Sequence, residues 1–274
     1  MKQTKLEMLL IPGALAVRFQ PIFELHNGSA RLYSVESLVH GPLGSTLERA
    51  DVLFDYIRLR HAEAELDRIC VGVVCDAVHE LPEHLPFAVN IHAATLSRDP
   101  RFLPDLFELL DARGVPRKRL TVEIVEHAPH WADAPLLAAL DSLRAAGARV
   151  ALDDIGLGQS NYRMMLDLQP DYFKIDRYFA HGCHGDSHRL AVLESVALLA
   201  ERFGSRVVVE GVERYEDLEA VSALGIRLIQ GHIFSRAVAG SEIRSFQGER
   251  PLPSMSPGSA PARPARVFSL PVGG

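Results

Sequence analysis

A series of polar residues able to bind a metal ion or move a proton follows short apolar runs along the chain. Each comes directly after residues such as Val150–Leu152 or Val207–Val209, a composition typical of a buried β-strand. Carboxylate and amide oxygens are hard ligands that suit Mg²⁺ or Mn²⁺. The series contains five carboxylates, one asparagine, one lysine and one glutamine: Glu36, Asn90, Glu123, Asp153, Asp154, Lys174, Glu210 and Gln230.

The adjacent pair Asp153–Asp154 points to a bound cation, because neighbouring carboxylates repel each other unless positive charge lies between them. Two metal ions about 3.5–4 Å apart lower the pKa of a bridging water and neutralise the attacking and leaving oxygens of a phosphate ester. Lys174 beside such a site would complement the negative charge of the transition state. Taken alone, Asp153–Asp154 would be a helix N-cap and Lys174 a solvated side chain. Their place in the series favours the site.

These residues need a scaffold that brings strand ends together, and the chain has the pattern of one. Helical patterns alternate with the apolar runs, as in a repeated βα unit. The polar residues follow nearly every run, which favours a closed (β/α) barrel over a doubly wound open sheet with one binding crevice. The expected strands of the repeat are Phe87–Ile91, Leu120–Val125, Arg149–Asp153, Asp171–Ile175, Arg206–Glu210 and Ile226–Gln230.

The start of the chain departs from a plain βα repeat. Asn27-Gly28 separates two strand-like runs, Val17–Leu25 and Ala30–His40, and predicts an antiparallel hairpin. A long helical pattern follows from about Leu47 to His79. We expect a short N-terminal segment (residues 1–16), one barrel domain (17–246) and a tail rich in Pro, Ser and Gly (247–274) that is disordered.

Composition limits the classes of partner. The chain has 274 residues, is 47% hydrophobic and carries a net charge of −6, so no basic surface is expected for a nucleic-acid polymer. The three cysteines lack the spacing of a disulfide framework and indicate a reducing compartment, which makes a cytoplasmic location the expectation. No apolar run approaches the length of about 20 residues that a membrane span needs, and Glu7 and Pro12 interrupt a weak signal-like start.

Short motifs recur at the strand ends over almost the whole chain: Phe19–Ile22, Val35–Val39, Val89–Ile91, Thr121–Glu126, Ala151–Gly158, Phe173–Asp176, Glu210–Glu213 and Gln230–Gly231. Read in order, these segments resemble the EAL-domain family of cyclic di-GMP phosphodiesterases. The resemblance implies a modified (β/α)8 barrel of the TIM type with one antiparallel strand. It also implies hydrolysis of one phosphodiester of cyclic di-GMP to the linear dinucleotide pGpG, with Mg²⁺ or Mn²⁺ at a two-metal site.

By this resemblance the strand-end residues acquire roles. Glu210 and Lys174, with Asp154 beside them, would position and deprotonate the attacking water, and Glu126 would steady the loop after Asp154. The metal ligands would be Glu36, Asn90, Glu123, Asp153, Asp154 and Glu210. The substrate contacts would be Gln230, His40, Gln20, Asp176 and Glu213. A homodimer formed through the loop after Asp154 and a regulatory protein partner are further expectations.

The chain departs from the family pattern beside the metal ligands. His40 stands where the family has an arginine that contacts a substrate phosphate, and histidine offers no bidentate fork and is mostly neutral at pH 7. Ile155, Leu157 and Gln159 change the loop that follows the two aspartates, and Ala237 replaces the usual proline. These changes motivate a second hypothesis, a weak or inactive EAL domain that serves as a cyclic di-GMP receptor or a protein-interaction module.

One polar cluster lies outside the family pattern. The side chains of His181, Cys183, His184 and His188 have a spacing that could hold Zn²⁺. The same segment could equally be a polar loop that enters the next helix, with Asp186 or Ser187 as its N-cap. Cys70 and Cys75 do not share a helix face and are expected in the core.

Overall fold

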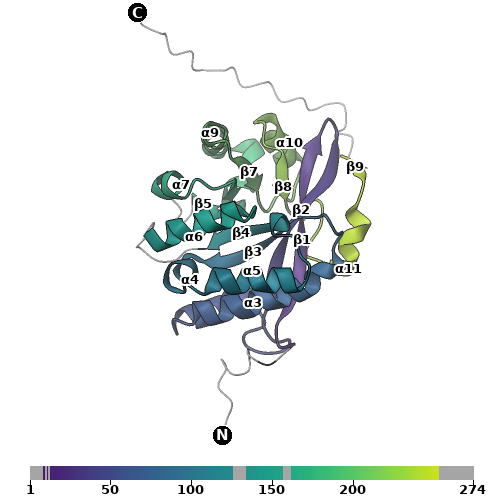
Figure 1. The fold of residues 1–274 in the computed structure, drawn as a ribbon. Helices are drawn as coiled ribbons and strands as arrows, with labels where there is room; N and C mark the ends of the chain where they lie inside the picture. Colours follow the sequence, from purple (N-terminus) through teal and green to yellow (C-terminus); the bar gives the residue numbers. More distant parts are fainter. Residues whose placement is uncertain (1–8, 10, 12, 126–133, 157–161, 253–274) are drawn as a thin grey trace, which may run out of the picture.

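Eight strands close into a barrel in the computed structural model, which describes residues 9, 11, 13–125, 134–156 and 162–252. The neighbour order is β1-β8-β7-β6-β5-β4-β3-β2, and pairing of β1 with β2 closes the ring (Figure 1). The predicted (β/α)8 barrel is therefore confirmed. The strands are β1 (Ala16–His26), β2 (Ser29–His40), β3 (Phe87–His92), β4 (Leu120–Val125), β5 (Arg149–Ile155), β6 (Tyr172–Ile175), β7 (Arg206–Val209) and β8 (Leu228–Gln230).

Strand β1 is the one antiparallel member of the ring, as the hairpin signal predicted. It runs antiparallel to both β2 and β8, whereas the neighbours from β2 to β8 pair in parallel. The turn between β1 and β2 contains Gly28 with a φ of 85°, a backbone conformation that glycine adopts without strain. The hairpin register places Gln20 opposite Glu36.

Helices follow one another around the outside of the strands (Figure 1). The predicted helical stretch Leu47–His79 is divided in two, because His61 with a φ of 54° interrupts it. The short helix α4 directly after β3 was not predicted. The helices are α2 (Ala50–Arg58), α3 (Glu63–Ala77), α4 (Ala93–Arg98), α5 (Phe102–Ala112), α6 (Ala134–Ala145), α7 (Tyr162–Leu168), α8 (Arg177–Ala180), α9 (Ser187–Phe203), α10 (Tyr215–Ala223) and α11 (Gly240–Ile243).

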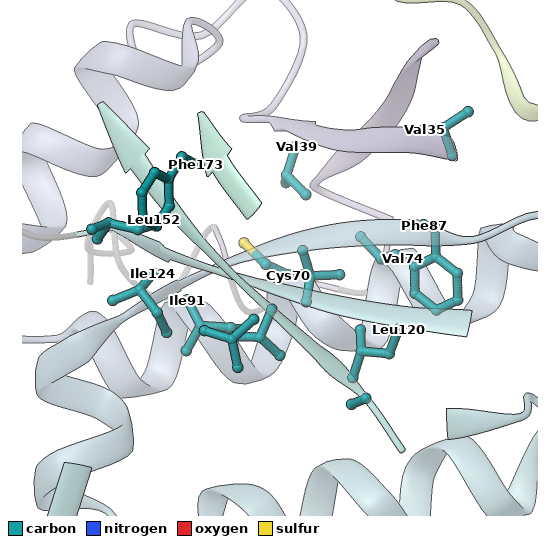
Figure 2. Close-up of a cluster of buried hydrophobic side chains, with 14 of the residues drawn as sticks. Val35, Val39, Cys70, Val74, Phe87, Ile91, Leu120, Ile124, Leu152 and Phe173 are labelled. Atoms are coloured by element: carbon teal, nitrogen blue, oxygen red, sulfur yellow. The ribbon is translucent and has the colours of Figure 1, made fainter. Parts of the chain in front are cut away.

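Two apolar cores hold the barrel, one outside it and one inside. The large core fills the space between the strands and the helices, where Phe87 and Leu120 pack near Val74 of α3 (Figure 2). The small core fills the barrel interior with Ile22, Ala151, Tyr172, Val208 and Leu228. Side chains alternate between the two faces of a strand, so every second residue from these inner ones also faces the barrel axis. These residues line the axis as far as the mouth of the barrel, at the carboxyl ends of the parallel strands.

The C-terminal boundary differs from the expected one. A short strand, β9 (Glu249–Pro251), pairs antiparallel with β2 through Ser29–Arg31, inside the stretch expected to be a disordered tail. Residues 253–274 of that tail lie outside the described part of the chain. Within the described residues, none of the helices combines the length and apolar character that crossing a membrane requires.

Candidate functional site

The strand-end residues meet at the mouth of the barrel. Glu36 lies on β2, Glu123 on β4 and Lys174 on β6, while Glu210 directly follows β7. Parallel strands with the same direction bring their carboxyl ends to one face, which is why residues up to about 190 positions apart become neighbours here. Glu36, Glu123, Lys174 and Gln230 are buried.

Four carboxylates surround the ammonium group of Lys174. Its Nζ lies 2.6 Å from Glu210 Oε1, 2.7 Å from Glu123 Oε2, 3.2 Å from Asp153 Oδ1 and 3.5 Å from Glu36 Oε2. The lysine side chain is 1% exposed, so bulk water screens these contacts little. We refer to Lys174 with Glu36, Glu123, Asp153 and Glu210 as the carboxylate cage.

Two amide side chains complete the cage wall. Asn90 Nδ2 donates a hydrogen bond to Glu36 Oε1 (3.2 Å), and Gln230 Nε2 donates one to Glu36 Oε2 (2.6 Å). These bonds use the donor end of each amide. The acceptor ends, Asn90 Oδ1 and Gln230 Oε1, are buried without a hydrogen-bond partner among the described residues. A buried unpaired carbonyl oxygen is costly, so both oxygens call for a cation or a donor group.

Burial opposes ionisation of the cage carboxylates Glu36, Glu123 and Glu210, and Lys174 offsets it only in part. Burial raises the pKa of Glu210 to about 8, and burial also holds the pKa of Glu123 well above its ordinary value despite the nearby ammonium. Burial opposes ionisation of Glu36 as well, but Lys174 and the two amide donors outweigh it and lower that pKa. Burial alone would lower the pKa of Lys174, whereas the four carboxylates hold it well above its ordinary value. One ammonium cannot neutralise four carboxylates.

Asp153 and Asp154 lie where β5 becomes irregular. The β5–β6 register shifts between Leu152 and Ile155, and Asp154 has a φ of 52°, a left-handed conformation that aspartate tolerates better than most residues. The Asp154 amide donates to Asp153 Oδ1 at 3.0 Å. Burial, then the charge of Asp153, raises the pKa of Asp154 to about 6. The bulge therefore presents two consecutive carboxylates at the mouth instead of sending them to opposite faces of the strand.

The donor set fits a hard divalent cation. Carboxylate and amide oxygens gather from six strand ends, and two of the amide oxygens have no hydrogen-bond partner among the described residues. Burial raises the pKa values of Glu123 and Glu210, and a bound cation would favour their charged forms. No three His, Cys, Asp or Glu side chains in the described ranges already stand around a common point as metal ligands do. At the mouth, the carboxylates close on Lys174 instead.

Gln20 and His40 both lie on the β1–β2 hairpin at the mouth. Gln20 is the cross-strand partner of Glu36 and shares its face. His40 ends β2, and its Nε2 is buried without a hydrogen-bond partner in the described part of the chain. Burial, then the charge of Arg18, lowers the pKa of His40 below its ordinary value. The imidazole is therefore neutral near pH 7 and lies within the electrostatic influence of an arginine.

The three remaining residues of the predicted set have different surroundings. Asp176 is the N-cap of α8, and its Oδ1 accepts a hydrogen bond from the Tyr178 amide at 2.7 Å. Glu213 is half-exposed and pairs with His232 at 3.4 Å. Glu126 lies outside the described residues. Asp176 thus has a structural function of its own, apart from any contact with substrate.

The barrel, its antiparallel strand and the strand-end carboxylates agree with one family, and residues 3–237 match the family model for the EAL domain. The chain belongs to the EAL domain family. Among curated relatives, it is 29% identical over 238 residues to the oxygen sensor protein DosP of Escherichia coli, covering 84% of this chain and 29% of DosP. It is 28% identical over 181 residues to the cyclic di-GMP phosphodiesterase PdeL of the same organism, covering 66% and 50%.

Solved EAL structures support the same assignment. A manganese/cy-diGMP complex of BlrP1 from Klebsiella pneumoniae superposes with a TM-score of 0.74 at 28% identity, covering 84% of this chain and 58% of that one. An EAL domain protein from Listeria monocytogenes gives a TM-score of 0.75 at 22% identity and supports the fold. The chain spans between about a third and a half of the two curated relatives, so their whole-protein activities are not transferred with the family.

In the described part of the chain, the histidine and cysteine cluster of this EAL domain is not arranged around a common point as zinc ligands are. Cys183 is fully buried and directs its Sγ to the carbonyl oxygen of Asp217, while His184 Nδ1 lies 2.7 Å from Asp217 Oδ1. The His188 side chain is fully exposed, and its Nδ1 lies 3.8 Å from Asp186 Oδ1. Asp186 instead caps α9 by accepting from the His188 and Arg189 amides, which confirms the loop-and-cap alternative.

Sequence reasoning left out one residue at the mouth of the EAL barrel. Arg18 lies on β1 two positions before Gln20, and the charge of this arginine is felt at His40. The alternation of Val17–Leu25 was a sufficient signal, because it places Arg18, Gln20 and Ile22 on one face of the strand.

Proposed function

We propose that this EAL domain hydrolyses one phosphodiester of cyclic di-GMP to the linear dinucleotide pGpG, with Mg²⁺ or Mn²⁺ as cofactor. The observation that carries the proposal is the carboxylate cage, in which four strand-end carboxylates share one ammonium beside two unpaired amide oxygens. A relative is named as a cyclic di-GMP phosphodiesterase, and a solved neighbour is described as a manganese/cy-diGMP complex.

The residues that would hold the metals are the carboxylates of the cage together with Asn90 and Asp154. A two-metal centre supplies a water of lowered pKa and positive charge for the attacking and leaving oxygens of a phosphodiester. In support, Asn90 Oδ1 is a buried carbonyl oxygen with no described partner, as a ligand oxygen would be before metal binds. The proposed ligands are Glu36, Asn90, Glu123, Asp153, Asp154 and Glu210.

Lys174 and Glu210 are the proposed groups that hold and move protons. The two side chains are hydrogen-bonded through Lys174 Nζ and Glu210 Oε1, so one can orient the other and both can bind the attacking water. Burial raises the pKa of Glu210, so this carboxylate takes up a proton more readily than an ordinary glutamate does. Lys174 Nζ keeps its proton and offers positive charge to the phosphate as negative charge grows on it.

The proposed substrate contacts include one residue of the cage wall, Gln230, and further polar residues outside the cage. Gln20 shares the face of Glu36, and Gln230 Oε1 is an acceptor that a guanine or water donor could use. His40, Asp176 and Glu213 complete this proposed set. Glu126 keeps its proposed function of steadying the loop after Asp154.

The test is turnover by purified protein. With cyclic di-GMP and either Mg²⁺ or Mn²⁺, chromatography should show the linear dinucleotide, and Glu36→Gln should abolish it while the circular dichroism spectrum stays native. Glu24→Gln is the matched control, because Glu24 lies on β1 at the opposite end of the barrel, where it pairs with Arg206. Wild-type protein that binds cyclic di-GMP tightly but gives no product in either metal would refute hydrolysis.

That last outcome describes the second candidate function, a cyclic di-GMP receptor or protein-interaction module without turnover. The specific observation in its favour is His40, a neutral imidazole at the place where the family has an arginine. Four of the six proposed metal ligands lie in the carboxylate cage, and Asn90 and Asp154 lie beside it, which favours hydrolysis over this second function.

We also propose that the domain forms a homodimer beside the two aspartates. Helix α7 follows β5 along the chain and exposes two large apolar side chains, Tyr162 (69% exposed) and Leu166 (61%). Light scattering of wild type and Leu166→Glu tests this, with Leu198→Glu on α9 as the matched control. A monomeric wild type at micromolar concentration would refute the dimer.

A further inference from the structure

Arg18 occupies the same face of the β1–β2 hairpin as the residues of the site. Ile22 faces the barrel interior, and the β-bulge of the hairpin falls after it, between Ile22 and Phe23. The alternation of side chains is therefore unbroken from Ile22 to Gln20 and Arg18. Phe19, between Arg18 and Gln20, points to the other side of the strand and is fully buried in the outer core. Its burial confirms that Arg18, Gln20 and Ile22 are on the face that lines the barrel axis.

The hairpin register fixes the height of Arg18 above the cage. Gln20 is opposite Glu36, Arg18 is opposite Leu38, and Ala16 is opposite His40. Each step of two residues advances about 7 Å along the strand. Because β2 runs toward the mouth, Arg18 and His40 stand in the layers just outside the carboxylate cage.

The backbone around Arg18 is held from both sides. The next residue, Phe19, exchanges two hydrogen bonds with Val238 (Phe19 N to Val238 O at 2.8 Å, Val238 N to Phe19 O at 2.9 Å). On the other side, β2 pairs along the whole length of β1. A side chain on such a braced strand keeps its direction with little entropy left to lose from the backbone.

The guanidinium of Arg18 has no carboxylate to neutralise it among the described residues. Its side chain is exposed, and its positive charge acts on His40, whose pKa is lowered first by burial and further by Arg18. Other arginines of the described chain, such as Arg68 with Asp99 and Arg206 with Glu24, form ion pairs. Arg18 is thus a cation available to a ligand at the mouth.

An anionic dinucleotide bound to this site needs such a cation. If one phosphodiester of cyclic di-GMP lies over the cage, the remainder of the molecule must extend outward, because the barrel below is filled by Ile22, Tyr172 and their neighbours. The outward layer contains His40, which is neutral near pH 7, and Arg18, which is always charged. A guanidinium fork is suited to a phosphate in a way that a neutral imidazole is not.

We infer that Arg18 on β1 is a substrate-binding residue of this domain, and that it supplies to a phosphodiester of cyclic di-GMP the charge-assisted contact that His40 at the end of β2 cannot. The inference rests on the proposed function. The contact then comes from β1, which pairs with the strand that carries His40. Arg18 lies two residues before Gln20, one step further out on the same face than the Gln20–Glu36 pair.

The experiment measures cyclic di-GMP affinity by calorimetry in Ca²⁺, with chromatography to verify that the ligand stays intact. Arg18→Ala should weaken binding about tenfold or more, the loss expected for one charge-assisted contact. Arg18→Lys, which keeps the charge but not the fork, should fall between the two. Arg31→Ala removes the same charge at the other end of the hairpin and should bind as wild type does.

A double-mutant cycle with His40→Arg gives a readout that a structural role would not move. Arg18→Ala/His40→Arg should recover most of the affinity lost in Arg18→Ala, and His40→Arg should gain more in that background than in the wild type. Raising the salt concentration should weaken wild-type binding more than Arg18→Ala binding. Melting temperatures verify folding, and Arg18→Gln repeats the comparison if Arg18→Ala melts early.

The outcomes separate the two proposals. Wild-type protein that binds cyclic di-GMP with an affinity that Arg18→Ala leaves unchanged overturns the assignment of Arg18 while the proposed function stands. Wild-type protein that neither binds nor hydrolyses cyclic di-GMP overturns the proposed function, and the assignment of Arg18 with it. A loss in Arg18→Ala that His40→Arg does not repair would place Arg18 in the folding of the hairpin, against the inference.

Discussion

Lys174 and Glu210 form the shortest contact of the carboxylate cage, with 2.6 Å between Nζ and Oε1. The two residues end neighbouring strands, and their backbones are linked as well, because the Glu210 amide donates to the Ile175 carbonyl at 3.0 Å. Lys174 is therefore a cation that holds the ends of β2, β4, β5 and β7 together. A divalent metal would compete for the same oxygens.

Replacing Lys174 with methionine removes that cation. Leaving buried carboxylates without their partner costs about 3–5 kcal/mol, which for a domain of this size lowers the melting temperature by about 10 °C in EDTA. Added Mn²⁺ should then raise the melting temperature of Lys174→Met more than that of wild type. Lys118→Met, at an exposed lysine, should match wild type in both conditions. A variant that melts no earlier than wild type in EDTA would contradict the cage description.

Asn90→Ala tests whether the unpaired amide oxygen is a metal ligand. The substitution removes Oδ1, which has no described partner, and one hydrogen bond of 3.2 Å to Glu36. We expect Mn²⁺ affinity, measured as the metal-induced shift in melting temperature across a titration, to fall by about ten- to a hundredfold. Asn90→Asp keeps an oxygen at the same place and should retain the shift. Equal metal affinity in wild type and Asn90→Ala would exclude Asn90 as a ligand.

His40→Arg should tighten cyclic di-GMP binding and lower KM, because an arginine adds a fork of donors where the imidazole is neutral. Arg18 limits the gain, since two neighbouring guanidinium groups repel each other and can serve the same phosphate. We expect a gain of less than about tenfold, and a small loss of stability in the ligand-free protein. His40→Gln, which adds no charge, is the control. An unchanged KM in both the wild-type and the Arg18→Ala background would show that His40 does not face the phosphate.

Labelling of the three cysteines tests whether Cys183 is a buried thiol and not a zinc ligand. Burial raises the pKa of Cys75 to about 11 and that of Cys183 to about 12, and it raises the pKa of Cys70 well above its ordinary value. At pH 8 all three are therefore protonated and inaccessible. A thiol reagent such as DTNB should label none of them in the native protein and three per chain in denaturant. Stoichiometric zinc after dialysis, lost in Cys183→Ala, would contradict this result.

The sequence was sufficient for the barrel and for the members of the cage, because both depend on alternation. Short apolar runs with a polar residue at the end predict strand ends, and the closed ring then brings Glu36, Glu123 and Lys174 together. The Asn27-Gly28 turn likewise determined the antiparallel strand. The turn signal is local, so tertiary packing did not need to be known.

Features that depend on tertiary contacts could not be predicted from the sequence. The apolar spacing of Leu47–His79 continues across the break at His61, so periodicity alone could not divide that helix. The left-handed Asp154 follows from the bulge in β5, and β9 follows from pairing with an edge of β2 that only the closed hairpin creates. The zinc spacing at residues 181–188 was misleading, because Asp217, about 30 residues away, binds His184 and the loop amides.

Because Gly231 has no side chain, the backbone can pass close to Val212 and carry Gln230 to the cage. Gly231→Ala should disturb both this close passage and the position of Gln230. A Cβ at this position would lie 2.0 Å from the Val212 carbonyl oxygen and 2.5 Å from its nitrogen, in a backbone crossing that two hydrogen bonds hold closed. We expect a loss of about 3 kcal/mol or more in the free energy of unfolding, measured by urea denaturation, together with weaker turnover. Gly72→Ala is the matched control, because nothing lies near its Cβ position and it is within helix α3. There the same change should stabilise the protein by about 0.5–1 kcal/mol. Equal effects of the two substitutions on the free energy of unfolding would show that the backbone after β8 can shift away from Val212 to make space for a Cβ.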